Sequence, residues 1–147
     1  MKTTTITIIA VVLSIVAVIG GLILNFPQFL YGDNANTKNL IVTILYLAIW
    51  LFVLFSAYKS KSRGVLIYFL VFWLSIIVVS AITMFAQITE WNFDWFIPFI
   101  LLIVPFYGIE FFTNNYVFSS IVIAAISSGM SIAAILLLRR SGSAVKK

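Results

Sequence analysis

The sequence predicts an all-α, polytopic membrane protein: a four-helix transmembrane bundle with an additional re-entrant or interfacial helical segment on the outer side. Of its 147 residues, 63% are hydrophobic and 9% are charged, whereas a soluble domain has about 45–50% apolar and 25% charged residues. Four uncharged apolar runs are each close to the roughly 20 residues that a helix needs to cross a bilayer. Most of the basic residues lie at the ends of these runs. We therefore treat residues 1–147 as one integral membrane domain.

The first predicted span covers residues 6–24 and follows Lys2. A cleaved signal peptide also begins with a basic residue and an apolar core, but this run is long and no clear small-x-small cleavage site follows it. We expect it to remain as a span. Small residues at 4-3-4 spacing share one face of this helix and predict close helix packing; they are Ala10, Ser14, Ala17 and Gly21.

The second and third predicted spans cover residues 40–58 and 65–87. The third span ends with Ser80, Thr83 and Gln87 at 3-4 spacing, so these polar side chains share a face. The simpler interpretation is that the hydroxyls bond to their own helix and that the Gln87 amide reaches headgroup water. The alternative is a shallow polar cavity that opens outward.

A fifth apolar stretch, residues 95–112, carries Pro98, Pro105 and Gly108 and is too interrupted to be assigned from hydropathy. The distribution of basic residues decides its topology, because Lys and Arg near span ends favour the cytoplasmic side. Four spans with both termini inside leave only Lys38 outside and eight of the nine basic residues inside. Five spans give a nearly even division in either orientation.

We therefore expect residues 95–112 to enter the outer leaflet and return, with five spans as the alternative. Residues 95–104 would form a half-helix of roughly 15 Å, about half the hydrocarbon thickness. Asn92 or Asp94 would cap this half-helix, and Pro105 and Gly108 would end it. Non-helical backbone at this depth must be satisfied by protein or by a water-filled cavity.

The last predicted span covers residues 117–138. It carries a second small-residue stripe, and we expect the first and last spans to pack along their stripes. The second stripe consists of Ser120, Ala124, Ser127, Ser131 and Ala134. The basic residues beside the inner ends of the spans predict anchors to an anionic inner leaflet; they are Lys59, Lys61, Arg63, Arg139 and Arg140.

Glu110 is the only carboxylate inside an apolar stretch. An ionisable group at membrane depth is a candidate for function, because a partner or water must offset its burial. It would bind a cation or carry a proton, and with Ser80, Thr83 and Gln87 it forms a candidate polar pathway. The alternative is that Glu110 reaches the outer headgroup level beside residues 113–116.

Composition excludes several classes of function. The chain has no His and no Cys, so thiol redox chemistry and Ser-His or Cys-His nucleophiles are excluded. We therefore expect no enzyme activity, no cofactor and no metal site. We also expect no nucleic-acid partner, because the basic residues behind the net charge of +5 are concentrated at span ends.

These observations predict a small non-catalytic protein of the cell membrane with both termini cytoplasmic. It would be an accessory, regulatory or immunity-type subunit that acts through helix–helix and outer-surface contacts. Its partners would be the lipid bilayer and another membrane protein or a second copy of itself. The alternative is a small oligomeric transporter or channel with an outer-facing polar pathway, and a third hypothesis is membrane perturbation of the holin kind.

Overall fold

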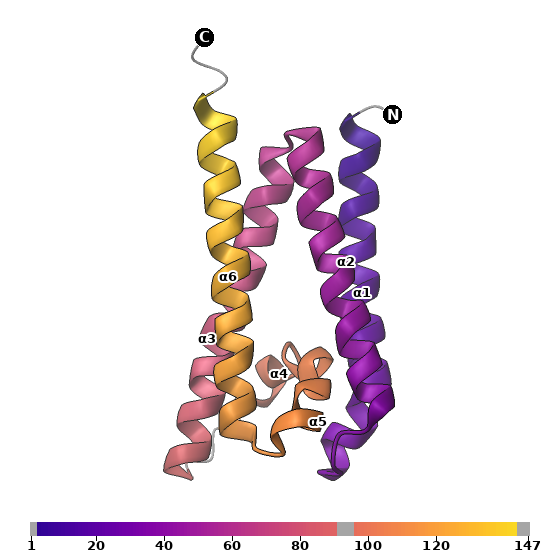
Figure 1. Ribbon diagram of the computed structural model, residues 1–147, viewed down its shortest axis with the longest axis vertical. Coiled ribbons are helices and arrows are strands. Elements are labelled where there is room, and N and C mark those ends of the chain that lie inside the picture. The colour runs from indigo at the N-terminus through magenta and orange to yellow at the C-terminus, as the bar shows by residue number, and fades with distance from the viewer. Residues whose placement is uncertain (1–2, 91–95, 144–147) are drawn as a thin grey trace.

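The protein is a bundle of long helices in the computed structural model, which describes residues 3–90 and 96–143 (Figure 1). Four helices are long and apolar enough to cross a membrane: α1 (Thr3–Tyr31), α2 (Thr37–Ser60), α3 (Arg63–Thr89) and α6 (Tyr116–Ser143). Three short helical pieces join α3 to α6: α4 (Ile97–Ile100), the 3-10 helix η2 (Val104–Ile109) and α5 (Glu110–Thr113). The prediction of an all-α membrane bundle is confirmed.

The chain reverses direction through turns that satisfy the backbone at the helix ends. Gly32 takes a positive φ of 68° after α1, and the N–H of Asp33 donates to the carbonyl of Gln28 at 3.1 Å. This is the Schellman ending, which favours glycine because it has no Cβ to clash. Asn36 then caps α2 by a capping box with Asn39, so two N–H groups at the helix start are bonded.

Helix α1 is longer than its predicted span of residues 6–24. It runs for 29 residues through Pro27, and residues 25–28, which lie beyond the predicted span, are helical. Pro27 removes one intrahelical hydrogen bond, but the helix continues because the Asn25 side chain beside it is fully buried and bonded to the segment that follows α4. Tertiary contacts therefore extend the helix past the point where the apolar run ends.

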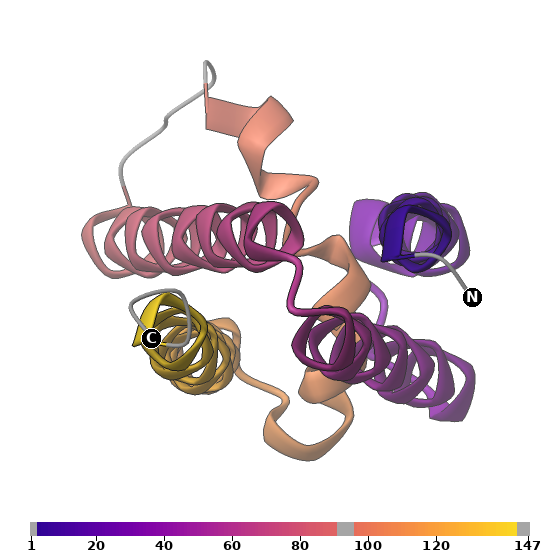
Figure 2. The same cartoon turned by 90° about the horizontal axis from the view of Figure 1, so that it is seen from above.

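The four long helices form two pairs. Helix α1 packs along α2, and α6 packs along α3. Residues 96–113, here called the re-entrant segment, lie at one end of the bundle, where α4 is on the outer side of α3 and the following residues pass between the helices (Figures 1 and 2). We call this end the re-entrant end. The opposite end holds the start of α1, the end of α6 and the α2–α3 turn with Lys59, Lys61 and Arg63 (Figure 1), and we call it the basic end.

The half-helix predicted for residues 95–104 is wrong. Helix α4 has four residues, and the next residues fold by i to i+3 bonds, such as the N–H of Ile103 to the carbonyl of Ile100 at 2.9 Å. Pro98 and Pro105 supply no N–H to a longer ladder, so the segment re-enters as a series of tight turns. The predicted caps Asn92 and Asp94 lie outside the described residues.

The predicted packing of the first span on the last is also wrong. In the described part of the chain, α1 and α6 do not pack along their small-residue stripes, and Figure 2 shows them on opposite sides of the bundle. The α1 stripe faces other partners: the Ser14 hydroxyl lies 3.0 Å from the Tyr68 hydroxyl of α3, and Gly21 faces Pro105. The α6 stripe is used in the contact with α3, where Ser127 and Ala134 are fully buried.

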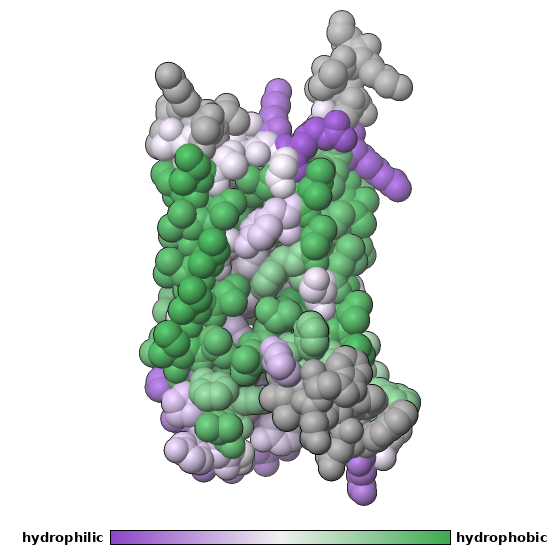
Figure 3. Space-filling model, turned by 180° about the vertical axis from the view of Figure 1, so that it is seen from behind, coloured by the Kyte–Doolittle hydropathy of each residue, from purple (hydrophilic) through white to green (hydrophobic). Residues whose placement is uncertain are grey.

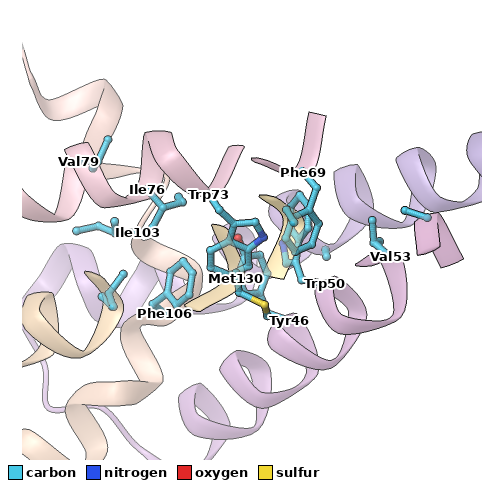
Figure 4. Close-up of a cluster of buried hydrophobic side chains, with 14 of the residues drawn as sticks. Tyr46, Trp50, Val53, Phe69, Trp73, Ile76, Val79, Ile103, Phe106 and Met130 are labelled. Atoms are coloured by element: carbon cyan, nitrogen blue, oxygen red, sulfur yellow. The ribbon is translucent and has the colours of Figure 1, made fainter. Parts of the chain in front are cut away.

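Aromatic side chains form the centre of the bundle (Figure 4). Trp50 of α2 lies with its ring centroid 5.7 Å from that of Trp73 of α3. Phe106 of the re-entrant segment lies 5.9 Å from Trp73 and 5.0 Å from Tyr46 in edge-to-face contacts. Edge-to-face geometry is favoured for aromatic pairs, so these rings join three separate elements into one core.

The outer surface matches a membrane environment. A green apolar belt covers the middle of the molecule in Figure 3, and hydrophilic residues gather at both ends. Exposed side chains of the belt come from every long helix, for example Ile19, Phe52, Val71 and Ile132. Contact of this apolar surface with lipid has no free-energy penalty, whereas its exposure to water would be unfavourable.

Candidate functional site

Two buried asparagines fasten the re-entrant segment to α1 and α2. The amide nitrogen of Asn25 donates to the carbonyl oxygens of Val104 and Pro105, at 3.3 and 3.2 Å. Asn39 donates to the Asn25 side-chain oxygen at 3.1 Å and to the Gln28 side-chain oxygen at 3.4 Å. These bonds give two carbonyls of the re-entrant segment polar partners, as non-helical backbone within a membrane requires.

Thr43 of α2 supplies the third bond of this kind. Its hydroxyl donates to the carbonyl of Pro105 at 2.7 Å and accepts from the N–H of Gly108 at 3.0 Å. One side chain therefore satisfies both a donor and an acceptor of the re-entrant backbone. We refer to Asn25, Asn39 and Thr43 as the polar clamp.

A cavity of about 240 Å³ lies at the re-entrant end, between the re-entrant segment and the ends of α1, α3 and α6. Its walls combine aromatic rings with a few polar side chains. They are formed by Phe29, Thr83, Gln87, Ile100, Ile103, Phe106, Tyr107, Glu110, Tyr116, Ser119, Ser120 and Ile123. An apolar pocket with a small number of polar groups is the usual form of a small-molecule site.

Glu110 begins α5 and is the acidic member of this cavity. Only 9% of the residue is exposed, and burial raises the pKa of its carboxyl to about 7. Its backbone carbonyl accepts the N–H of Asn114, where the chain turns towards α6. The carboxyl therefore lines the cavity and is largely covered by the surrounding residues.

Tyr107 forms the wall of the cavity next to Glu110. Its ring meets that of Phe29 edge to face, with 5.7 Å between centroids, and its hydroxyl donates to the backbone carbonyl of Asp33. Burial raises the pKa of the Tyr107 hydroxyl, and the neighbouring Tyr116 and the carboxylates of Glu110 and Asp33 raise it further. Tyr107 thus ties the α1–α2 loop to the re-entrant segment as a neutral hydrogen-bond donor.

Three of the four residues of the candidate polar pathway line this cavity: Thr83, Gln87 and Glu110. Gln87 is exposed and lies at the mouth, whereas the Thr83 hydroxyl donates to the Val79 carbonyl of its own helix at 2.8 Å. Ser80 does not line the cavity. It is fully buried one turn deeper along α3, and its hydroxyl has no partner among the described residues.

The cavity ends against the aromatic core. Phe106 belongs to both, and Trp73, Phe69 and Trp50 follow it towards the basic end, all fully buried. Along α3, Trp73 lies more than two turns from Thr83 in the direction of the basic end. In this conformation the described core fills the middle of the bundle beyond the cavity (Figure 4).

The predicted basic anchors lie at the opposite end of the molecule from Glu110. Lys59 and Lys61 line a shallow surface pocket of about 400 Å³ with Arg140, Tyr58 and Ser141. The Lys59 ammonium also lies 4.9 Å from the centroid of the Phe55 ring. Arg63 begins α3 and Arg139 is near the end of α6, and both are exposed.

Comparison of the chain with protein-family models, with curated proteins and with solved structures gave no match. The fold and the surface define a class, a small helical membrane protein.

Proposed function

We propose that this protein is a non-catalytic subunit of the cell membrane, accessory, regulatory or immunity-type, which acts through contacts of its helices and its re-entrant end with another membrane protein. The observation that carries the proposal is the closed aromatic core. Trp50, Phe69, Trp73 and Phe106 are fully buried in the middle of the bundle, so within the described residues a single copy provides no open route for a solute. The exposed apolar faces of the four spans remain available for contacts with other helices.

The proposal includes an orientation with both termini in the cytoplasm. The start of α1, the α2–α3 turn and the C-terminal end of α6 share the basic end (Figure 1). The shared position of the basic anchors at this end supports a cytoplasmic basic end, because Lys and Arg near span ends favour the cytoplasmic side. Each charge near an anionic leaflet contributes about 1 kcal/mol to this arrangement.

The test is site-specific photo-crosslinking in native membranes. A benzophenone amino acid would replace one exposed residue on each span in turn, at Ile19, Phe52, Val71 or Ile132. We expect one or two faces to give a discrete protein adduct of constant mass, while the remaining faces crosslink only lipid. Lipid adducts from all four faces, together with the mass of a lone monomer after extraction in mild detergent, would contradict the proposal.

A transporter or channel is the second candidate, because the cavity brings Thr83, Gln87 and Glu110 together. A route would have to run between copies or require the aromatic core to open. Reconstituted vesicles test it directly: proton or K⁺ flux above that of empty vesicles, lost in Glu110→Gln and Gln87→Leu, would favour transport. Flux that both substitutions leave unchanged would remove these residues from any pathway.

A further inference from the structure

The carboxyl of Glu110 has no countercharge in the described part of the chain. Burial is the sole cause of its raised pKa, which means that no neighbouring cation lowers it. Lys38, the one basic residue predicted on this side, is exposed at the start of α2. A buried carboxylate without a partner is unfavourable, and a bound cation would offset its desolvation.

The surroundings of Glu110 favour an organic cation over a metal ion. Hard cations such as Ca²⁺ take about six to eight oxygen ligands, whereas no group of three acidic side chains occurs among residues 3–90 and 96–143. Four aromatic residues line the cavity instead: Phe29, Phe106, Tyr107 and Tyr116. Aromatic walls attract ammonium groups through the negative faces of the rings, which is how quaternary ammonium ligands are recognised.

We propose that this cavity binds a small organic ammonium cation, with the Glu110 carboxylate as its counter-ion and the aromatic rings as its walls. The volume of about 240 Å³ is below the 300–1,000 Å³ that is typical of drug-sized ligands, so the ligand is an amine of a few heavy atoms. The amide of Gln87 and the hydroxyl of Ser119 offer acceptors for N–H donors of primary amines. This inference stands independently of the proposed contacts with another membrane protein.

The ammonium group of the ligand has two candidate sources. Gln87 near the end of α3, Phe29 near the end of α1 and Tyr116 at the start of α6 place the cavity mouth at the level where the spans end. That level is also the headgroup region of a bilayer. The ligand is therefore either a free amine from the aqueous phase or the ethanolamine headgroup of a phospholipid.

The first experiment measures binding to the purified full chain in a neutral detergent at pH 8. Tetramethylammonium chloride and ethylammonium chloride are titrated by calorimetry, with sodium chloride and the uncharged isostere tert-butanol as controls. We expect saturable binding of at least one ammonium salt and none of tert-butanol. Absence of binding by both ammonium salts, or equal competition by sodium, would overturn the proposal.

Variants assign the binding to the cavity. Glu110→Gln preserves the shape and removes the charge, so affinity should fall by about tenfold or more. The matched control Glu90→Gln alters an exposed carboxyl at the end of α3 and should change affinity by less than twofold. Unchanged affinity in Glu110→Gln, with its melting temperature intact, would overturn the proposal.

A second pair of variants tests the site without changing the Glu110 carboxyl. Tyr116→Leu removes an aromatic wall and should weaken tetramethylammonium binding about threefold or more. Phe118→Leu, an exposed position on the same helix that does not line the cavity, should have no effect. Equal behaviour of the two variants would remove the aromatic rings from the site.

The two sources are separated in nanodiscs. If the ligand is a lipid headgroup, phosphatidylethanolamine is retained by the wild type and by Glu90→Gln but not by Glu110→Gln in native mass spectrometry, and added lipid displaces tetramethylammonium. If the ligand is a free amine, tetramethylammonium binds equally well in discs of phosphatidylglycerol with and without phosphatidylethanolamine. Tetramethylammonium binding that is lost in both kinds of disc would overturn the proposal.

Discussion

The backbone of Gly108 in the re-entrant segment lies directly against the backbone of Asn39 in α2. A Cβ atom placed on Gly108 would overlap the carbonyl of Asn39 and lie 2.6 Å from the Cα of Leu40. The same glycine donates its N–H to the hydroxyl of Thr43. This close approach joins the re-entrant segment to a spanning helix and sets the position of Glu110, two residues further along.

Gly108→Ala should destabilise the protein by about 2 kcal/mol or more, because the new methyl group meets backbone atoms that cannot rotate away. Unfolding in mixed micelles of mild detergent and dodecyl sulfate would measure the loss. Gly129→Ala in α6 is the matched control, since nothing lies within 4 Å of its Cβ position. That variant should be neutral or slightly more stable, as alanine favours a helix, and a similar loss in both variants would contradict the close approach.

The polar clamp gives a second prediction. Thr43→Val keeps the side-chain shape but removes the bonds to Pro105 and Gly108, so stability should fall by about 1–2 kcal/mol. Thr89→Val is a suitable comparison, because the exposed Thr89 hydroxyl bonds only within its own helix. We expect little change there. If Thr43→Val unfolds at the same dodecyl sulfate fraction as the wild type, the clamp does not hold the segment in place.

The proposed orientation is tested by cysteine labelling, for which the chain offers a cysteine-free background. Single cysteines at Asn34 and Asn115 lie on the re-entrant end, and one at Ser62 lies on the basic end. A membrane-impermeant maleimide added to intact cells should label the first two, and Ser62→Cys only after permeabilisation. Labelling at Asn34 with protection at Asn115 would instead mean that the re-entrant segment crosses the membrane.

The number of spans could be predicted from the sequence, because crossing a bilayer imposes a length and a composition that few other structures share. The distribution of basic residues then separated four spans from five. The helix ends could not be predicted in the same way. The first apolar run ends near residue 24. Helix α1 nevertheless continues to Tyr31, because the buried Asn25 side chain forms hydrogen bonds with the re-entrant segment.

The packing partners of the helices could not be predicted from the sequence. Small residues on α1 and α6 indicated that these faces are buried, which is largely correct, but not which partner buries them. The α1 face contacts Tyr68 and Pro105, residues far away in the chain. A stripe of small residues defines only a close approach, and an apolar side chain gains little by facing another helix instead of lipid.

The candidate site could be predicted in part. Glu110 and Gln87 attracted attention as polar groups in apolar runs, and both line the cavity. The polar clamp was missed because Asn25 and Asn39 resemble the residues of an ordinary turn. One signal was present: Thr43 begins a 3-4-3-4 stripe with Tyr46 and Trp50 that proves to be buried.

Ser80 gives a further prediction. Its hydroxyl is buried with no partner in the described structure, so Ser80→Ala should leave stability unchanged or raise it slightly by removing an unpaired polar group. Ser14→Ala should be destabilising, because its hydroxyl pairs with Val11 and Tyr68. Thermal unfolding of the two variants in the same detergent provides the comparison. A loss of stability in Ser80→Ala would indicate that a bound water or ligand pairs with this hydroxyl.

The last prediction concerns pH. The pKa of the Glu110 carboxyl is about 7 in the folded protein against an ordinary value of 4.5, so the folded state holds this proton more tightly than the unfolded state. Stability should therefore fall as pH rises from about 5 to 7 and become independent of this group above that range. The other titratable groups around it are Asp33, Tyr107 and Tyr116.

Unfolding measured between pH 5 and 8 would show this slope, and comparison with two variants would assign it. Glu110→Gln should abolish the fall, since the amide cannot ionise, and Glu90→Gln should retain it. An ammonium ligand at Glu110 would oppose the fall, because it favours the ionised carboxyl. The curve measured with saturating tetramethylammonium should therefore be flatter than the curve without it, and a slope that survives in Glu110→Gln would assign the pH dependence to another group.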